Sequence, residues 1–81
     1  MKISAEVSYY PLNEEYKVPI KAFIKALNNY GNLEVRTNTM ATQVFGEYNE
    51  VMNAIRDCMK DAFELPHSVF VMKIINADLS K

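Results

Sequence analysis

The beginning of the chain alternates between two kinds of side chain. Over residues 2–10, apolar residues occupy every second position, with mainly polar residues between them. The apolar positions are Ile3, Ala5, Val7 and Tyr9. A period of two is typical of a β-strand that buries one face and turns the other away from the core. The alternation therefore predicts a strand over residues 2–10, which the segment from Pro11 to Asn13 ends.

The next apolar residues follow helical spacing. Pro19 suits the first turn of a helix, because the N–H that proline lacks has no helical partner there. The apolar stripe after it consists of Ile20, Phe23, Ile24, Leu27 and Tyr30. Gly31 is the expected stop, in the left-handed conformation that often follows the end of a helix. The pattern predicts an amphipathic helix that ends near Asn29.

The centre of the chain has the pattern of two short strands joined by a turn. Leu33–Arg36 is the first strand, and the polar segment Thr37–Thr39 is the turn. The second strand is expected from about Met40 to Phe45, with Met40 packed in the core. Gly46 is expected to break this strand, because glycine in a strand often marks an irregularity.

A second helix and a final strand complete the pattern. The apolar stripe of the helix consists of Val51, Met52, Ile55, Met59, Ala62 and Phe63. Cys58 falls on the same side and is expected to be buried. Pro66 lies beyond the helix end, and Ser68–Ile75 is the last strand.

The order of these elements is β-α-β-β-α-β in a chain of 81 residues. This order predicts an α+β, ferredoxin-like sandwich, in which two helices cover one face of a four-stranded antiparallel sheet. The first and third strands are expected at the centre of the sheet. No linker or low-complexity tract interrupts the pattern, so residues 1–81 are expected to form a single domain.

The other face of this sheet has no helix to cover it, yet apolar residues point to both faces. Val69–Met72 is an unbroken apolar run, and Tyr9 and Tyr10 are adjacent aromatic residues. A bare apolar face of this size usually marks an interface. We therefore expect a homo-oligomer, a dimer or a tetramer, that packs through the helix-free face. The alternative is an edge strand with scattered exposed aliphatic side chains.

Glu6 belongs to the polar set of the first strand and is expected on the helix-free face. If a partner covers that face, the Glu6 carboxylate is largely buried and needs a partner of its own. Lys73, on the neighbouring last strand, is one candidate. A ligand that offers an N–H group or a cationic ring is the other, and the sequence leaves both open.

Composition and charge exclude several classes of site and partner. Cys58 and His67 are each the only residue of their type, so the chain has no disulfide of its own and no metal site is expected. The net charge is −1 and the basic residues form no stripe, which argues against nucleic acid as a partner. No apolar run is long enough for a membrane helix, and no targeting signal is recognised. We expect a cytoplasmic protein.

The segment 37–48 carries the densest group of neutral polar side chains. Four hydroxyl groups and two amides fall within twelve residues. Such a set offers hydrogen-bond donors and acceptors with almost no charge, which suits a small heterocycle better than proton transfer. The alternative is a turn rich in Asn and Thr with no ligand.

Two segments carry a resemblance to a known family. Ile3–Leu12 looks like the opening strand, with its Pro-Leu exit, of the YkoF-like thiamin/hydroxymethylpyrimidine-binding proteins. Met40–Met52 resembles the second signature of that family, in which a Thr near the start of the third strand precedes a Gly-Glu-aromatic entry into the second helix. The matching order of elements extends the resemblance from about Lys2 to Asn76.

The resemblance implies a ferredoxin-like fold whose sheets stack in oligomers or tandem repeats. It also implies a pocket by the sheet for thiamin or its pyrimidine moiety, a link to uptake or salvage of the vitamin, no established catalysis and no cofactor. The residues that it places at polar positions of the strands or on the rim of the pocket are Ser8, Thr37, Asn38, Thr39, Thr42 and Gln43.

Physical reasoning adds three candidates. A carboxylate such as Glu6 suits the exocyclic amine of an aminopyrimidine and the positive thiazolium of thiamin. Tyr10 or Phe45 could stack on the ring. Thr42 and Gln43 are adjacent in one strand and point to opposite faces. Both can therefore contact one ligand only if the strand bulges or the ligand lies at its end.

Two other functions compete with ligand binding. An acylphosphatase-like enzyme needs a glycine-rich, phosphate-binding loop after the first strand, whereas Pro11–Glu15 is acidic. No nucleophile–base pair is visible either, so no catalytic residue is expected. A ligand-independent assembly or regulatory module would need the same oligomer without a pyrimidine pocket.

Overall fold

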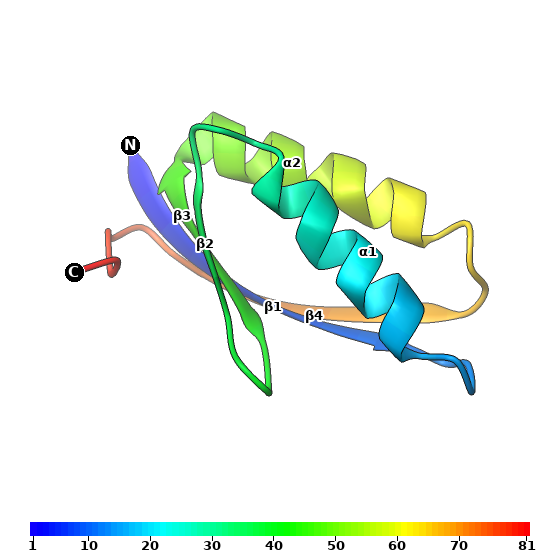
Figure 1. Ribbon diagram of the computed structural model, residues 1–81. Helices are drawn as coiled ribbons and strands as arrows, with labels where there is room; N and C mark the ends of the chain where they lie inside the picture. The colour runs from blue at the N-terminus through cyan, green and yellow to red at the C-terminus, as the bar shows by residue number, and fades with distance from the viewer.

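The computed structural model describes all residues from 1 to 81. Its elements follow the predicted order: β1 (Lys2–Pro11), α1 (Lys17–Asn28), β2 (Glu34–Thr37), β3 (Thr42–Glu47), α2 (Tyr48–Ala62) and β4 (Ser68–Ile75). The four strands form one antiparallel sheet in the order β2-β3-β1-β4, with β1 and β3 at the centre as predicted. Both helices lie on the same side of the sheet (Figure 1). The ferredoxin-like fold is confirmed.

The register of β1 fixes which side chains share a face of the sheet. Val7 lies opposite Thr42 on the helix side. Glu6 lies opposite both Gln43 of β3 and Lys73 of β4, and these residues point to the helix-free face. Because side chains alternate along a strand, every second residue from each of these pairs belongs to the same face.

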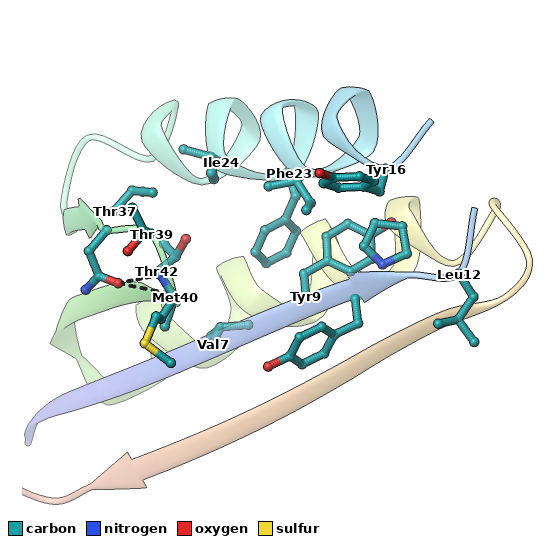
Figure 2. Close-up of a pocket in the computed structure, with 15 residues that line it drawn as sticks. Val7, Tyr9, Leu12, Tyr16, Phe23, Ile24, Thr37, Thr39, Met40 and Thr42 are labelled. Atoms are coloured by element: carbon teal, nitrogen blue, oxygen red, sulfur yellow. Dashed lines mark hydrogen bonds between the residues drawn. The ribbon is translucent and has the colours of Figure 1, made fainter. Parts of the chain in front are cut away.

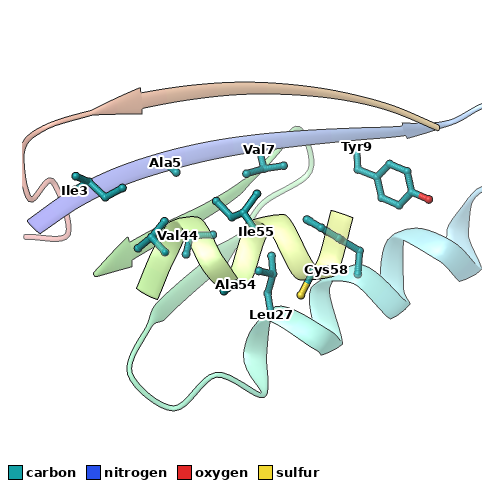
Figure 3. Close-up of a cluster of buried hydrophobic side chains, with 11 residues drawn as sticks. Ile3, Ala5, Val7, Tyr9, Leu27, Val44, Ala54, Ile55 and Cys58 are labelled. Atoms are coloured by element: carbon teal, nitrogen blue, oxygen red, sulfur yellow. The ribbon is translucent and has the colours of Figure 1, made fainter. Parts of the chain in front are cut away.

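The core lies between β1, β3 and the two helices (Figure 3). The predicted apolar set of β1 is buried there, and Leu27 of α1 and Ile55 of α2 are almost completely inaccessible. Burial of one such aliphatic side chain stabilises the fold by about 1.5–3 kcal/mol. Cys58 is also buried, as predicted, and this burial raises the pKa of its thiol.

An aromatic cluster closes the end of the core beside β4. The rings of Tyr9 and Phe70 are stacked with their centroids 4.3 Å apart. Phe23 meets Tyr9 edge to face at 5.5 Å. These contacts fix the Tyr9 ring on the helix side of β1, where it also borders the cavity described below.

The expectation that Gly46 breaks β3 is wrong. The strand continues through Gly46 to Glu47, and α2 begins at the next residue, with the Glu47 side chain accepting a hydrogen bond from the Asn49 amide at 3.1 Å. The reason for glycine is space: a Cβ at position 46 would lie 2.8 Å from Cδ2 of Leu33. Glycine here allows a close approach between neighbouring segments.

The expectation of a left-handed Gly31 is also wrong, because no glycine has a positive φ. α1 ends at Asn28, and the chain leaves it through tighter turns. The Asn29 amide donates to the Ala26 carbonyl at 3.2 Å, and the Tyr30 amide donates to the Leu27 carbonyl at 3.1 Å. These bonds satisfy the last carbonyls without a left-handed residue.

Met40 lies outside the core, contrary to expectation. Its side chain is 83% exposed, because β3 begins two residues later and Met40 sits at the tip of the β2–β3 hairpin. Neither helix combines the length and apolar character needed to cross a membrane.

Candidate functional site

A cavity of about 390 Å³ lies between α1 and the β2–β3 hairpin, which we call the hydroxyl cleft (Figure 2). It is lined by Val7, Tyr9, Tyr10, Pro11, Leu12, Tyr16, Ile20, Phe23, Ile24, Thr37, Asn38, Thr39, Met40, Ala41 and Thr42. Its volume falls at the lower end of the usual range for small-molecule sites, ~300–1,000 Å³. A small heterocycle is therefore the appropriate size of ligand.

The polar side of the hydroxyl cleft comes from the hairpin. Thr37 ends β2, Thr42 begins β3, and Thr39 lies in the turn between them. Thr42 is opposite Val7 and is only 6% exposed. Threonine hydroxyls both donate and accept hydrogen bonds, so this side can serve the ring nitrogens and the amine of a heterocycle.

Asn38 holds the hairpin turn in shape. Its Oδ1 accepts hydrogen bonds from the amides of Met40 at 2.9 Å and Ala41 at 3.0 Å (Figure 2). The backbone N–H of Asn38 in turn donates to the Ala41 carbonyl at 3.0 Å. The side-chain oxygen is therefore engaged in the turn, and only its NH₂ group remains for a ligand.

The opposite side of the hydroxyl cleft is aromatic. Tyr9 from β1 and Phe23 from α1 are packed edge to face, and both are at least 90% buried. Tyr16, just before α1, is half exposed. Figure 2 shows the three rings beside the cavity, with the threonines at its other end. Flat aromatic ligands pack well against such rings, which add about 0.5–1.5 kcal/mol beyond area burial.

The hydroxyl cleft contains no Asp, Glu, Lys, Arg or His among its lining residues. Its hydrogen-bonding groups are all neutral. Because burial of an unpaired charge is costly, such a lining favours an uncharged ring inside the cavity.

A second cavity, of about 320 Å³, lies on the helix-free face, and we call it the carboxylate cavity. It is lined by Ser4, Ala5, Glu6, Gln43, Phe45, Lys73, Ile74, Ile75 and Leu79. Glu6 Oε1 is 3.1 Å from Lys73 Nζ. The hydrogen bond and the positive charge of Lys73 lower the pKa of Glu6, and Gln43 adds a smaller effect in the same direction. The pairing of Glu6 with Lys73, one of the two alternatives, is thus present.

The sheet divides the predicted binding residues between its two sides. The hydroxyl cleft brings together Thr37, Asn38, Thr39 and Thr42. Glu6 and Gln43 lie in the carboxylate cavity on the other side. β3 is regularly paired with β1 from Thr42 to Glu47, so no bulge brings Thr42 and Gln43 to one face.

The remaining predicted residues lie at the margins. Tyr10 borders the hydroxyl cleft, but strand alternation directs its side chain to the helix-free face, opposite Val69. Ser8 lines neither cavity; its hydroxyl donates to the Met40 carbonyl at 3.4 Å. Phe45, the other predicted stacking ring, lies under the Arg36 guanidinium at 4.9 Å.

Sequence reasoning missed the aromatic side of the hydroxyl cleft. Tyr9 and Phe23 were assigned to the core, and they do pack there while also bordering the cavity. Their strand and helix periodicity gave the direction of the side chains but not the cavity beside them. Tyr16 follows no periodic pattern, and the sequence around it gives no indication that it borders a cavity.

Known proteins resemble this chain in sequence and in fold. A family model described as thiamine-binding protein matches residues 5–78. No curated protein matches the chain in sequence. Solved structures show the same fold. A hypothetical protein of Methanocaldococcus jannascii has a TM-score of 0.83 and 26% identity, over 99% of this chain and 84% of its own.

Two further solved structures share the fold at lower sequence identity. A protein of Streptococcus pneumoniae has a TM-score of 0.90 and 19% identity, over 100% of this chain and 92% of its own. A Thermotoga maritima protein, provisionally described as acting in thiamine biosynthesis or salvage, has a TM-score of 0.85 and 18% identity. That match covers 95% of this chain and 85% of the other.

Proposed function

Because the chain belongs to the thiamine-binding protein family, we propose that it binds thiamine or its hydroxymethylpyrimidine moiety in the hydroxyl cleft without catalysing a reaction. The observation that carries the proposal is the lining of this cavity. It combines an aromatic side, a side of threonine hydroxyls and no charged residue. An aminopyrimidine is flat, uncharged near neutral pH and rich in hydrogen-bonding atoms, so it matches each of these properties.

The proposed pose places the pyrimidine between the two sides of the hydroxyl cleft. Tyr9 and Phe23 contact the ring, while Thr39 and Thr42 exchange hydrogen bonds with its nitrogens and its amine. Hydrogen bonds of this kind contribute about 0.5–1.5 kcal/mol each. The Asn38 NH₂ group is a further donor to a ring nitrogen, since its oxygen is held in the turn.

The thiazolium ring of thiamine carries a positive charge and has no carboxylate to meet inside the hydroxyl cleft. We place it at the mouth, beside the half-exposed ring of Tyr16. A cation over a tyrosine face gains about 0.5–1 kcal/mol at exposed sites. The pyrimidine thus supplies most of the recognition, and the thiazolium supplies little.

Binding without chemistry is supported by the same lining. General acid–base catalysis most often uses a His, Asp, Glu or Lys side chain within hydrogen-bond reach of the reacting group. The hydroxyl cleft has none of these, and its polar side chains are threonine and tyrosine hydroxyls and one amide. A role in uptake or salvage of the vitamin is the biological setting we propose, and the unpaired, buried Cys58 is compatible with the cytoplasm.

The helix-free face supports the proposal of a homo-oligomer, a dimer or a tetramer. Tyr10, Val69, Val71 and Ile75 point to this face and are 42–55% exposed. Tyr10, Val69 and Val71 are neighbours and form an apolar strip along β1 and β4, which is the kind of surface that proteins usually cover, whereas the Glu6–Lys73 pair separates Ile75 from them. The same strip would serve the alternative function, a ligand-independent assembly or regulatory module.

Isothermal titration calorimetry with thiamine and with hydroxymethylpyrimidine tests the proposed function. We expect both compounds to bind, and with similar affinity, because the pyrimidine makes most of the contacts. No heat and no thermal-shift response at millimolar concentrations would exclude the binding function and favour the assembly module.

A further inference from the structure

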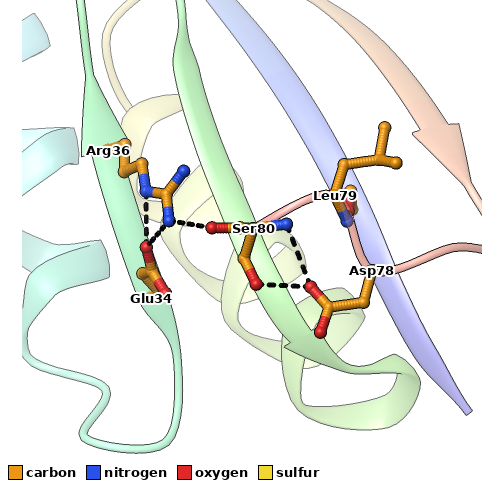
Figure 4. Close-up of polar contacts among 6 residues, drawn as sticks. Glu34, Arg36, Asp78, Leu79 and Ser80 are labelled. Carbon is orange, nitrogen blue, oxygen red and sulfur yellow. Dashed lines mark hydrogen bonds and ion pairs between the residues drawn. The ribbon is translucent and has the colours of Figure 1, made fainter.

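The C-terminal segment 76–81, which we call the strap, crosses the helix-free face from one edge of the sheet to the other. It leaves β4 at one edge, is bonded to Ser4 of β1 and reaches Arg36 of β2 at the opposite edge (Figure 4). The strap therefore covers one half of a face that no helix covers. The half that carries Tyr10, Val69 and Val71 stays open.

Ser4 fastens the middle of the strap. Its hydroxyl donates to the Ala77 carbonyl at 2.7 Å and accepts from the Leu79 amide at 2.8 Å. Ser4 is only 6% exposed, although it points to the helix-free face. Both of its hydrogen bonds go to the strap, so this one side chain binds the backbone groups on both sides of Asp78.

The far end of the strap is held by Arg36. Its guanidinium donates to the Ser80 carbonyl and to the Glu34 carboxylate, and it lies over the Phe45 ring. Asp78 Oδ1 accepts from the Ser80 amide at 3.0 Å and shapes the turn before this contact (Figure 4). Phe45 is 7% exposed beneath this arrangement.

The strap also forms part of the carboxylate cavity, because Leu79 lines it together with Glu6 and Gln43. Its anchors are a few hydrogen bonds and one leucine side chain that is 57% exposed. Segments with few buried apolar contacts open locally at much lower free energy than the core. The strap can therefore move while the sheet stays intact.

We propose that the strap opens and closes the carboxylate cavity, and that the two hydrogen bonds of Ser4 hold it in the closed position. With the strap in place the Glu6 side chain is 35% exposed and Gln43 is half-buried, whereas Phe45 is buried. The open form uncovers the Phe45 ring and widens the access to Glu6 and Gln43 for a small molecule that carries a cationic nitrogen and an apolar ring. The cation would replace Lys73 as the partner of the Glu6 carboxylate. The Lys73 side chain is 80% exposed and free to turn into solvent. This site is separate from the hydroxyl cleft and does not depend on the ligand bound there.

Thiol labelling measures the opening directly. One variant, Gln43→Cys, places a thiol inside the carboxylate cavity, and a matched variant, Val71→Cys, places one on the same face beyond the strap. Each is compared with and without Ser4→Ala, with the neutral reagent methyl methanethiosulfonate and mass spectrometry as readout. The buried Cys58 reports whether the domain stays folded.

If the strap opens in this way, Ser4→Ala should speed labelling at position 43 by about fivefold or more, because two hydrogen bonds of about 0.5–1.5 kcal/mol each are lost. Labelling at position 71 should change by less than about twofold, since no strap contact lies there. A chain that ends at residue 76 should label at position 43 at least as fast as the Ser4→Ala variant. Equal rates at position 43 in all three backgrounds would overturn the proposal, as would a rise at positions 43, 58 and 71 together.

Discussion

Thr42 and Gln43 are consecutive residues of β3, and their side chains line separate cavities on opposite faces of the sheet. Thr42 lies opposite Val7 and lines the hydroxyl cleft, whereas Gln43 lies opposite Glu6 and lines the carboxylate cavity. The backbone between them is regular, so one small ligand cannot contact both side chains. This pair therefore identifies which face of the sheet binds the pyrimidine.

Thr42→Val should weaken binding of hydroxymethylpyrimidine by about three- to tenfold, the effect of one lost hydrogen bond of ~0.5–1.5 kcal/mol. Valine keeps the shape of threonine and suits a strand, so the fold should remain intact. Calorimetric titration gives the affinity. Gln43→Ala is the matched control and should bind like the native chain. The reverse order of effects would move the binding site to the helix-free face.

Gly46→Ala should lower the free energy of unfolding by about 1–2 kcal/mol. The added Cβ would lie 2.8 Å from Leu33 Cδ2 and 3.3 Å from Val51 Cγ2, and overpacking of a core costs ~1–3 kcal/mol. Urea denaturation measures the change. Gly31→Ala is the control, because its Cβ would meet no atom within 4 Å and its φ is not positive. Equal stability of the two variants would contradict the close approach at Gly46.

Lys73→Ala should raise the pKa of Glu6 back toward its ordinary value of 4.5. In the native chain the pair lowers this pKa, so its stabilising contribution is present above pH 4.5 and is lost as the pH falls through the lowered value. An NMR titration of the Glu6 carboxyl carbon gives the pKa in each variant. Lys21→Ala, on the helix side, should leave it unchanged. An unaltered Glu6 titration in Lys73→Ala would show that the ion pair does not form in solution.

Val71→Glu should weaken self-association, because it places a charge in the apolar strip of the helix-free face. Val18→Glu is a matched control, since Val18 is also exposed but lies in the first turn of α1. Sedimentation velocity over a range of concentrations measures the oligomer. Stacked sheets lie about 10 Å apart, which leaves no room for the strap between them. The open half near Val71 is therefore the proposed contact, and equal association of both variants would exclude it.

The sequence was sufficient for the fold because each element carries a strong period. The alternation from Ile3 to Tyr9 and the helical stripe through Leu27 both depend on burial against the same core, so local pattern and tertiary structure agree. The boundaries were less certain. Gly46 and Gly31 were interpreted as conformational signals, whereas packing space explains Gly46 and no such constraint applies to Gly31.

The site was only partly predictable for physical reasons. Alternation shows that Thr42 and Gln43 point apart, but it does not show where α1 leaves an open space. Tyr9 serves the core and the hydroxyl cleft at once, and a burial pattern cannot separate the two roles. The strap has no periodic pattern at all: its position depends on Ser4, whose small polar side chain gave no indication of a distant partner.

Two-dimensional ¹H–¹⁵N NMR of the native chain, titrated with hydroxymethylpyrimidine and then with thiamine, tests the central claim most directly. Binding in the hydroxyl cleft predicts that the largest amide shifts fall in the segment 37–42 and at Tyr9, Tyr16 and Phe23, and that both compounds move the same resonances. Shifts confined to Glu6 and Gln43, or no shifts at millimolar ligand, would contradict it.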